Sequence, residues 1–442
     1  MDSMKRYVPS RFNAIAHTDN NGLVLYNSYT GAIASFSEEE KGEILLALKR
    51  EGIKGELSDP LKRLVESGFL VPDHVNEDMR AKFLHQSLHR TDQMHLVLFP
   101  TEECNFRCTY CYETFPRGKM DDDTIEGLKK YVEQNASRLN LLSISWLGGE
   151  PLLAIDVIEE LSKSFLDTVE KYGIDYTADI STNGYFLTDD VFKKLLNWKI
   201  RRFMITIDGL EPIHDQRRHL LGGGKTFSRI IDHLKNIKDS NEEFEITIRV
   251  NFDENNLPAM PELISFLSEH FSEDKRFGIF FRPVGRWGGV NDDQIPVCMN
   301  GRRDEKIWEL TKLSLEKGLK MSSIIENSLL PTGSVCYAAK PYSLVVGSNG
   351  KLYKCSIAFE DEKNQIGQIY RDGSIKIDYD KFAFWVTSGE ENDSVCQSCF
   401  YRPACQGNHC PLYRMRTGLR PCSYEKRRIK KVLNLIWKSY IS

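Results

Sequence analysis

The chain has 442 residues, with 59 basic and 63 acidic side chains and a formal net charge of −4. This balance gives no global electrostatic attraction to nucleic acid or to an anionic membrane. No segment approaches the apolar length of a membrane span, and the first residues lack the apolar stretch of a signal peptide, so we expect a cytoplasmic protein. A chain of this length is typical of two or three domains.

Residues 1–88 predict a small winged-helix-like domain. Residues 22–29 are typical of paired strands with a turn at Gly31, and a capping-box pattern opens a helix at Ser37. Residues 61–71 predict a second helix followed by a short strand.

Residues 91–320 alternate predicted strands and helices. The strands are expected at Met94–Phe99, Ser143–Trp146, Tyr176–Ile180, Phe203–Ile207, Glu245–Val250 and Phe277–Phe281. Six βα units in series imply a parallel sheet and fit an open partial barrel, (β/α)6, because a closed TIM barrel needs eight. The predicted fold class is therefore α/β, with the functional residues at the carboxyl ends of the strands.

Three cysteines follow the first of these strands in C-x-x-x-C-x-x-C spacing, at Cys104, Cys108 and Cys111. Three thiolates leave one iron of a four-iron cluster open for a ligand. A zinc knuckle is the alternative, although zinc sites usually take four ligands with paired two-residue gaps. The motif resembles that of the radical S-adenosylmethionine (SAM) superfamily, which also has an aromatic residue before the third cysteine, here Tyr110.

This resemblance implies an enzyme in which the open iron chelates SAM and an electron from the cluster cleaves it to a 5'-deoxyadenosyl radical. It implies that Cys104, Cys108 and Cys111 are the catalytic cluster ligands and that Tyr110 lies beside the adenine. The sequence Gly148-Gly149-Glu150-Pro151 is similar to the family's GGEP motif, whose backbone and acidic side chain hold the methionine ammonium.

Three further residues are expected to contact SAM by the same resemblance. Ser181 and Asn183 are the expected ribose contacts, with turn formation by Asn183-Gly184 as the competing explanation. Arg249 is expected on the methionine carboxylate, or alternatively as an ordinary salt-bridged strand residue. Asp208, His214 and Asp215 follow the fourth strand and are expected to be solvated loop residues.

Residues 330–442 are rich in cysteine and resemble the SPASM domain, which houses two auxiliary [4Fe-4S] clusters. The resemblance assigns one set to an outer cluster, namely Cys396, Cys399, Cys405 and Cys422, and another to an inner cluster, namely Cys336, Cys355 and Cys410. The inner set is one thiolate short, and Cys298 either fills the vacancy or is a free buried thiol. Two structural zinc sites are the alternative, because thiolate count alone does not separate zinc from iron–sulfur. With the radical SAM cluster, three [4Fe-4S] clusters are expected.

The order of the three domains resembles that of maturases of ribosomally made peptides. Residues 1–88 resemble their PqqD-like domain, which binds the leader of a precursor peptide as an added strand; an N-terminal cap with no ligand is the alternative. An external electron donor of the flavodoxin or ferredoxin type is implied. The tail at 425–440 has apolar residues at helical spacing and predicts a C-terminal helix docked on the barrel.

An open iron on the inner cluster would bind a substrate cysteine as thiolate, which points to intramolecular thioether formation. The resemblance is then to the sactipeptide and ranthipeptide maturases. Two other classes stay open. One is a radical SAM enzyme that makes formylglycine or a carbon–carbon or ether crosslink, and the other is a metal-cluster peptide-binding module without catalysis.

Overall fold

The computed structural model describes residues 5–49, 51–287, 292–298, 302–387 and 389–441. The chain divides into two compact units. We call Arg90–Ser322 with Pro341–Trp385 the barrel unit, and Met1–His89 with Ser323–Lys340 and Val386–Ser442 the terminal unit.

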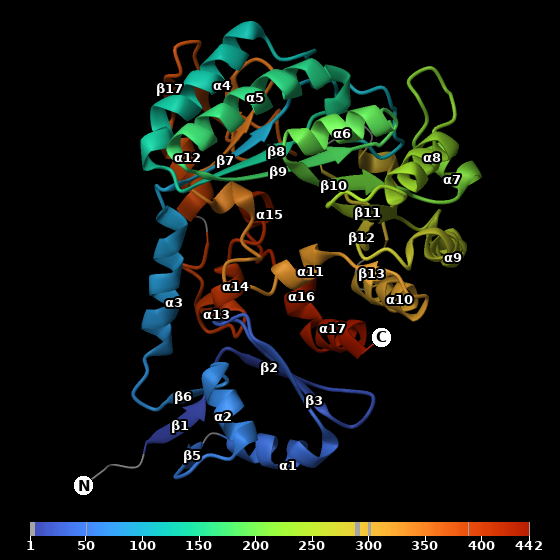
Figure 1. Cartoon of the computed structure of the whole chain (residues 1–442). Coiled ribbons are helices and arrows are strands. Elements are labelled where there is room, and N and C mark those ends of the chain that lie inside the picture. The colour runs from blue at the N-terminus through green and yellow to red at the C-terminus, as the bar shows by residue number, and fades with distance from the viewer. Residues whose placement is uncertain (1–4, 50, 288–291, 299–301, 388, 442) are drawn as a thin grey trace. The chain divides into compact units, whose positions relative to one another are not determined.

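The barrel unit is built on one large sheet whose main strands are parallel (Figure 1). Six of its strands correspond to the six expected from the sequence: β7 (Gln93–Leu98), β8 (Leu141–Trp146), β9 (Asp175–Thr182), β10 (Ile200–Thr206), β11 (Glu245–Phe252) and β12 (Phe277–Pro283). Neighbours in sequence are neighbours in the sheet, so all six carboxyl ends lie at one edge. This agrees with an open partial barrel of the α/β class.

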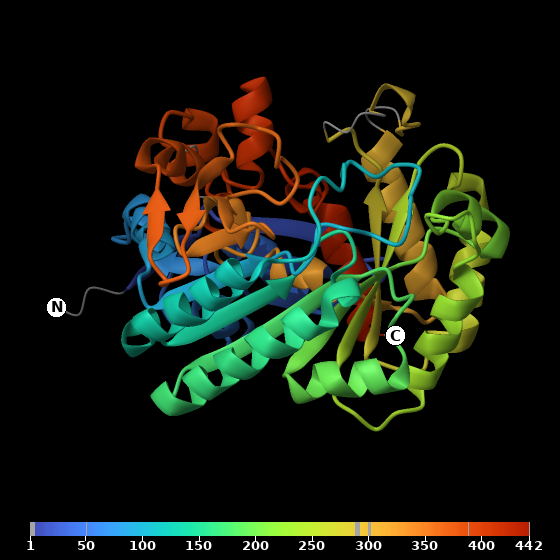
Figure 2. The same cartoon turned by 90° about the horizontal axis from the view of Figure 1, so that it is seen from above.

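Alternating polarity decides which face of the sheet the helices cover. In β8, Leu142, Ile144 and Trp146 are buried, whereas Ser143 and Ser145 between them are only half-buried. The helices that follow the strands pack along the apolar face (Figures 1 and 2). They are α4 (Asp122–Asn135), α5 (Ile155–Tyr172), α6 (Asp189–Asn197), α7 (Glu211–Arg217), α8 (Phe227–Lys238), α9 (Met260–Phe271) and α10 (Arg302–Glu316).

Local sequence signals explain where the helices begin and end. Asp121 caps α4 by accepting a hydrogen bond from the Thr124 backbone N–H at 2.7 Å, and Thr188 caps α6 in the same way. Helix α5 ends at Gly173, whose φ of 68° is the left-handed conformation that glycine adopts without strain.

The sheet is wider than the six predicted strands. The short β13 (Lys320–Met321) extends it beside β12, and β14 (Ser343–Val346) pairs in parallel with β7 on the other side. Antiparallel strands then continue from β14, namely β15 (Lys351–Tyr353), β16 (Gln365–Ile369) and β17 (Ile375–Ile377). Helix α12 (Tyr379–Thr387) follows them. Part of the segment assigned from its cysteines to a C-terminal domain therefore belongs to the barrel unit.

The terminal unit contains two small antiparallel sheets. One has the order β5 (Ile53–Lys54), β1 (Arg6–Pro9), β6 (Leu70–Pro72), and the other is the meander β2 (Asn13–His17), β3 (Leu23–Asn27), β4 (Ile33–Phe36). The predicted capping box at Ser37 is present and opens α1 (Glu38–Ala47), and α2 (Asp59–Glu66) precedes β6 as expected. Helix α3 (Glu77–Gln86) follows β6.

The C-terminal part of the terminal unit consists of short helices: α11 (Ser323–Asn327), α13 (Ser394–Gln397), α14 (Arg402–Cys405), α15 (Pro411–Thr417), α16 (Tyr424–Arg427) and α17 (Ile429–Ile441). The apolar face of α17 is buried, as its spacing predicts, at Val432, Leu433 and Ile436. Helix α17 packs against β2 and β3, so the expectation of a helix docked on the barrel was wrong. An amphipathic pattern predicts a buried face without identifying what covers it.

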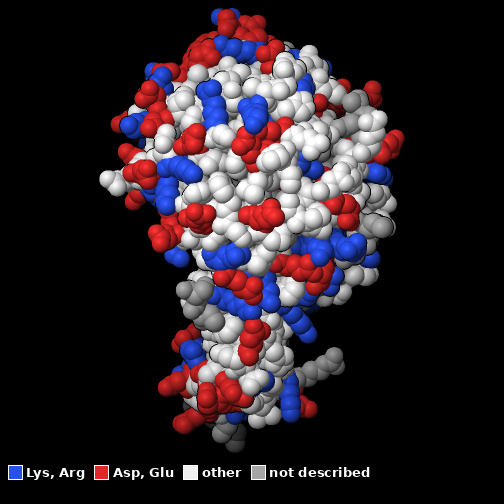
Figure 3. Space-filling model, turned by 90° about the vertical axis from the view of Figure 1, so that its right-hand side faces the viewer, with Lys and Arg blue, Asp and Glu red and all other residues white. Residues whose placement is uncertain are grey.

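Acidic and basic side chains are interspersed over the face shown in Figure 3. Within the described residues, no helix combines the length and hydropathy needed to cross a bilayer.

Candidate active site

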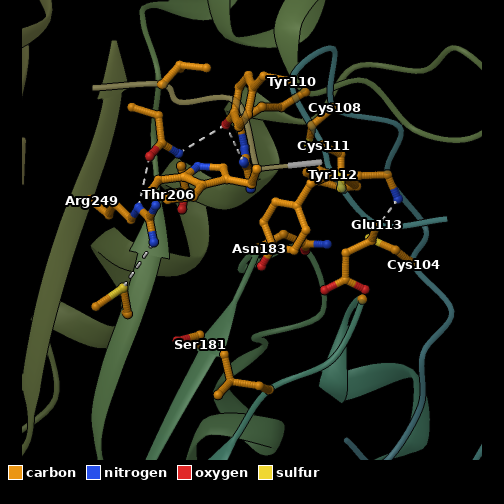
Figure 4. A pocket seen from close by; sticks show the side chains of 18 of the residues that line it. Cys104, Cys108, Tyr110, Cys111, Tyr112, Glu113, Ser181, Asn183, Thr206 and Arg249 are labelled. Atoms are coloured by element: carbon orange, nitrogen blue, oxygen red, sulfur yellow. Dashed lines mark hydrogen bonds between the residues drawn. The ribbon is translucent and has the colours of Figure 1, made fainter. Parts of the chain in front are cut away.

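A cavity of about 210 Å³ lies at the carboxyl ends of the barrel strands (Figure 4). Its lining comes from the loops after β7, β8, β9 and β12 and from the last residues of β10 and β11. The predicted residues Cys104, Cys108, Tyr110, Cys111, Gly148, Gly149, Ser181, Asn183 and Arg249 all line it. Residues separated by up to 145 positions in sequence therefore meet in one place, which is the arrangement expected of a parallel sheet.

The cysteine loop is held in place by a second loop. Backbone N–H groups of Arg107 and Thr109 donate to the carbonyls of His219 and Arg217, both at 2.9 Å, and Leu221 N–H donates back to Asn105 at 2.7 Å. The segment at 217–221 begins at the last residue of α7. The charged sequence after the fourth strand therefore lies beside the cysteine loop and is hydrogen-bonded to it.

The three thiols are partly buried, and burial raises the pKa of both Cys104 and Cys111 to about 12. Burial also raises the pKa of Cys108, against the opposing effect of the Arg218 charge. Thiols with such pKa values become thiolates when a bound cation neutralises them, as iron does. Three convergent thiols in a cavity with room for a further ligand fit a four-iron cluster with one open iron.

Gly148 and Gly149 bring two backbone segments closer than any side chain would allow. A Cβ at Gly148, where φ is 134°, would lie 2.3 Å from the Thr101 carbonyl oxygen, and one at Gly149 would lie 2.4 Å from that of Glu103. The glycine pair thus packs directly on the chain that leads into the cysteine loop. Its backbone faces the cavity, as the resemblance to the GGEP motif led us to expect.

Glu150 is placed differently from the expectation. Its side chain is fully buried and does not line the cavity. Its carboxylate accepts hydrogen bonds from Thr182 Oγ1 at 2.6 Å, from Asn183 N–H at 2.7 Å and from Leu152 N–H at 3.0 Å. The acid therefore joins the strand ends of β8 and β9, and a direct contact between Glu150 and the cofactor stays a prediction.

Tyr110 lines the cavity and lies at the centre of a buried polar network. Its hydroxyl donates to Asp208 and accepts hydrogen bonds from Arg218 Nη1 at 2.8 Å and from Asn251 Nδ2 at 3.1 Å. Burial raises the pKa of Tyr110 well above its ordinary value, so the phenol stays protonated. Asp208 and His214 are fully buried, so their expected place in a solvated loop was wrong.

Two other residues predicted to contact SAM, Asn183 and Arg249, are oriented by hydrogen bonds to neighbouring residues. Asn183 Nδ2 donates to Asn105 Oδ1 at 2.8 Å and its Oδ1 caps Tyr185 N–H, so it both forms the turn and lines the cavity. Arg249 Nε donates to Asn251 Oδ1 at 2.8 Å, which orients the guanidinium. In Figure 4 Arg249 lies across the cavity from the cysteines, with Ser181 and Asn183 between.

The lining residues that were not predicted from the sequence include Glu113, Arg218, Asn251 and Trp287. Burial, with a smaller effect of Glu102, raises the pKa of Glu113 to about 8. Arg218 lies in the charged sequence at 214–219, and Asn251 lies two residues after Arg249 on the same strand, so these positions were the available signals. Nothing in the sequence marks Trp287, which reaches the cavity from the loop after β12.

Residues 98–267 match the family model described as the Radical SAM superfamily. An uncharacterised protein of Methanocaldococcus jannaschii is 30% identical over 261 residues, covering 59% of this chain and 84% of that protein. The chain belongs to the radical SAM superfamily. It is therefore a radical SAM enzyme, and the superfamily's [4Fe-4S] cluster and SAM fit the three-cysteine cavity.

A further relative of this radical SAM enzyme is named a sulfatase-maturating enzyme, and two solved structures of similar fold contain a bound peptide. The serine-type anaerobic sulfatase-maturating enzyme of Klebsiella pneumoniae is 23% identical over 346 residues, covering 73% of this chain and 83% of that enzyme. The structure of anSMEcpe with bound AdoMet and Cp18Cys peptide matches with a TM-score of 0.59 at 19% identity, covering 79% of this chain and 98% of that one. The structure of Streptococcus suis SuiB bound to precursor peptide SuiA matches with a TM-score of 0.52 at 15% identity, covering 93% of this chain and 97% of that one. These structural likenesses show a shared fold.

The radical SAM enzyme has a second cysteine site in its terminal unit. Cys396, Cys399, Cys405 and Cys422, the set predicted for an outer cluster, line one small pocket. Burial raises the pKa of Cys405 to about 12, so here too a bound cation is needed to hold thiolates. Among the described residues, no three His, Cys, Asp or Glu side chains lie close enough together to hold a single metal ion.

The remaining cysteines are Cys298, Cys336, Cys355 and Cys410. Cys336 and Cys410 belong to the terminal unit, where Cys336 N–H donates to the Asn408 carbonyl at 3.0 Å. Cys355 follows β15 in the barrel unit, so an inner cluster on these three cysteines stays a prediction. Cys298 is buried in the barrel unit near the charges of Glu254 and Asp253.

Proposed function

We propose that this radical SAM enzyme is a peptide maturase that forms intramolecular thioether links in a ribosomally made precursor. The observation that carries the proposal is the separation of the cysteines: three converge with Gly148 and Gly149 in the barrel cavity, and four others line a pocket in the terminal unit. The remaining candidates, Cys336, Cys355 and Cys410, supply one thiolate fewer than a four-iron cluster takes. A substrate cysteine would complete that set.

The barrel residues have defined tasks in this proposal. When bound at Cys104, Cys108 and Cys111, the cluster and SAM supply a radical that removes a hydrogen atom from the peptide. Arg249, oriented by Asn251, offers a guanidinium fork to a carboxylate such as that of SAM. The buried hydrogen-bond network of Tyr110 forms one wall of the cavity.

Replacing one C–H bond and one S–H bond by a C–S bond is a two-electron oxidation, so each link removes two hydrogens from the peptide. The protein's residues contribute position and exclusion of water, and the cofactors contribute the difficult chemistry. An external electron donor of the flavodoxin or ferredoxin type completes the proposal.

The terminal unit offers edges for the leader of a precursor. Strands β5 and β6 are the two edge strands of their sheet, and β6 pairs with β1 on one side. An extended peptide that adds to such an edge gains backbone hydrogen bonds without a sequence motif. We propose that residues 1–88 bind the leader in this way, in keeping with their resemblance to PqqD-like domains.

Formylglycine formation is the second candidate, and it is favoured by the likeness to serine-type sulfatase-maturating enzymes. Thiol alkylation together with the peptide mass separates the two candidates, because formylglycine formation from cysteine also consumes the thiol but expels its sulfur. Cysteine-containing peptides and matched peptides with serine at the same position would be incubated with the enzyme, SAM and a reductant. A thioether maturase removes free thiols with a loss of two hydrogens and leaves the serine peptides unmodified. Equal modification of the serine peptides contradicts the proposal.

Metal content tests the cluster assignments without a peptide. After anaerobic reconstitution we expect about twelve irons per chain, and about eight when Cys104, Cys108 and Cys111 are all changed to alanine. The triple variant should form no 5'-deoxyadenosine. About four irons in the wild type, or mostly zinc, would mean that the C-terminal cysteines do not hold clusters.

A further inference from the structure

The four-cysteine pocket of the terminal unit is lined by several basic side chains. Besides Cys396, Cys399, Cys405 and Cys422, four cationic side chains line it, namely Arg402, Arg414, Arg420 and Lys426. A [4Fe-4S] cluster held by four thiolates is an anion in both of its usual oxidation states, so these cations complement it. They do not act equally, because their contacts differ.

Arg414 contacts a cysteine sulfur directly. Its Nη2 lies 3.4 Å from Cys396 Sγ and 3.3 Å from the Gly407 carbonyl oxygen, and its Nη1 donates to Asp393 Oδ2 at 3.1 Å. The side chain is 15% exposed, so water screens its charge weakly. The guanidinium is therefore oriented on both sides and aimed at the sulfur.

Asp393 fixes the cysteine and the arginine together. Its Oδ1 accepts hydrogen bonds from the backbone N–H groups of Val395 and Cys396, both at 3.2 Å, and thereby caps α13. The single N–H of Arg420 Nε also donates a bifurcated hydrogen bond to the two Asp393 carboxylate oxygens, each 2.9 Å from the nitrogen. Asp393 thus sets the position of Cys396 relative to Arg414.

The other sulfurs receive weaker donors. Cys399 Sγ accepts a hydrogen bond from the neutral backbone N–H of Tyr401 at 3.4 Å. Backbone N–H groups of His409 and Gly407 act on Cys405 and lower its pKa against the effect of burial. Cys396 receives its hydrogen bond from a full positive charge, which is the stronger kind.

We propose that Arg414, held by Asp393, is a positioning residue that sets the reduction potential of the cluster in this pocket. The inference rests on the proposed cluster at Cys396, Cys399, Cys405 and Cys422. Hydrogen bonds to the sulfurs and nearby charge are among the factors that fix iron–sulfur potentials. A cation donating to a thiolate stabilises the reduced, more negative cluster, so Arg414 raises the potential and makes this cluster the better electron acceptor.

A redox titration followed by electron paramagnetic resonance tests this. The full chain would carry alanine at Cys104, Cys108 and Cys111, so that only C-terminal signals remain, and the signal lost in Cys399→Ala identifies the outer cluster. Arg414→Gln should make the midpoint potential of that signal more negative by about 59 mV. For a one-electron couple this corresponds to about a tenfold change in the equilibrium constant of reduction. Arg414→Lys, which keeps the charge, should retain most of the wild-type potential.

Arg420→Gln is the matched control. It also removes one positive charge and one ion pair with Asp393, but Arg420 is 48% exposed and donates to Asp393, so we expect less than half the shift. An equal shift in Arg414→Gln and Arg420→Gln, or no shift in either with full iron content, would overturn the inference. Loss of iron in both Arg414→Gln and Arg414→Lys would also overturn it, by showing a purely structural role. A wild type with no iron in this pocket would instead remove the proposed cluster itself.

Discussion

Thr182 Oγ1 donates a hydrogen bond to Glu150 Oε1 at 2.6 Å, which ties the end of β9 to the loop after β8. Glu150 is fully buried and also accepts from the backbone of Asn183, whose side chain lines the cavity. One acid thus aligns two of the loops that line the cavity.

Glu150→Ala should therefore lower stability as well as SAM affinity. It leaves three buried donors without an acceptor, at about 1–3 kcal/mol for each donor that does not find another partner. Thermal unfolding of the protein without cofactors measures this. Thr182→Val should reproduce part of the loss, and Thr182→Ser, which keeps the hydroxyl, should not. Unchanged stability with reduced SAM binding in Glu150→Ala would restore the direct-contact role.

Gly149→Ala should disrupt the cysteine loop. The new Cβ would lie 2.4 Å from the Glu103 carbonyl oxygen, a backbone atom that moves only if the loop leading to Cys104 moves. We expect loss of iron from the radical site and of 5'-deoxyadenosine formation. Gly118→Ala is the control, because its Cβ would meet only the Glu103 side chain at an ordinary 3.5 Å. Wild-type iron content in Gly149→Ala would contradict the packing argument.

His214 should make stability depend on pH on the acid side of neutrality. Burial, and then the charges of Arg218 and Arg217, hold the pKa of His214 well below its ordinary 6.5, and its Nδ1 accepts from the Asp208 N–H at 3.3 Å. Below pH 6.5 the unfolded histidine binds a proton that the folded one does not. The stabilisation is therefore complete above pH 6.5 and is lost as pH falls below it, by up to about 1.4 kcal/mol per pH unit.

Urea unfolding at several pH values tests this with His214→Asn, whose side-chain oxygen still accepts a hydrogen bond. The slope of stability against pH below 6.5 should be smaller in this variant by about one proton. His74→Asn changes an exposed histidine and should keep the wild-type slope. Equal slopes in the wild type and His214→Asn would show that another group is responsible.

Cys298→Ser should leave the iron content unchanged. Cys298 is buried near Glu254 and Asp253, and the nearest other cysteine in sequence is Cys336, 38 positions later, which fits a free buried thiol. Cys355→Ser is the comparison and should lose about four irons if the inner cluster is present. A loss of about four irons in Cys298→Ser would instead identify it as the missing ligand.

The sequence predicted what depends on short spacing or on local periodicity. Each of the six strands shows its own pattern of apolar residues, so their positions and parallel order followed without any long-range information. The cysteine spacing at 104–111 and the glycine pair at 148–149 indicated the radical SAM chemistry for the same reason, because each motif is complete within a few residues.

The sequence did not predict which residues far apart in the chain contact one another. That Glu150 binds Thr182 instead of lining the cavity, and that Asp208 and His214 are buried with Tyr110, depends on how strand ends meet. The sequence also did not predict that α17 packs on β2 and β3 or that β14 joins the barrel sheet. An apolar face or strand does not specify its partner.

The chain's sequence by itself therefore determined the reaction class, because the ligands of the radical site are neighbours in the chain. Only the tertiary structure decided which polar side chains face the cavity and which hold its walls, and which cation reaches Cys396. The physical reason is that burial and hydrogen bonding belong to pairs of groups, and here the partners lie 18 to 141 residues apart.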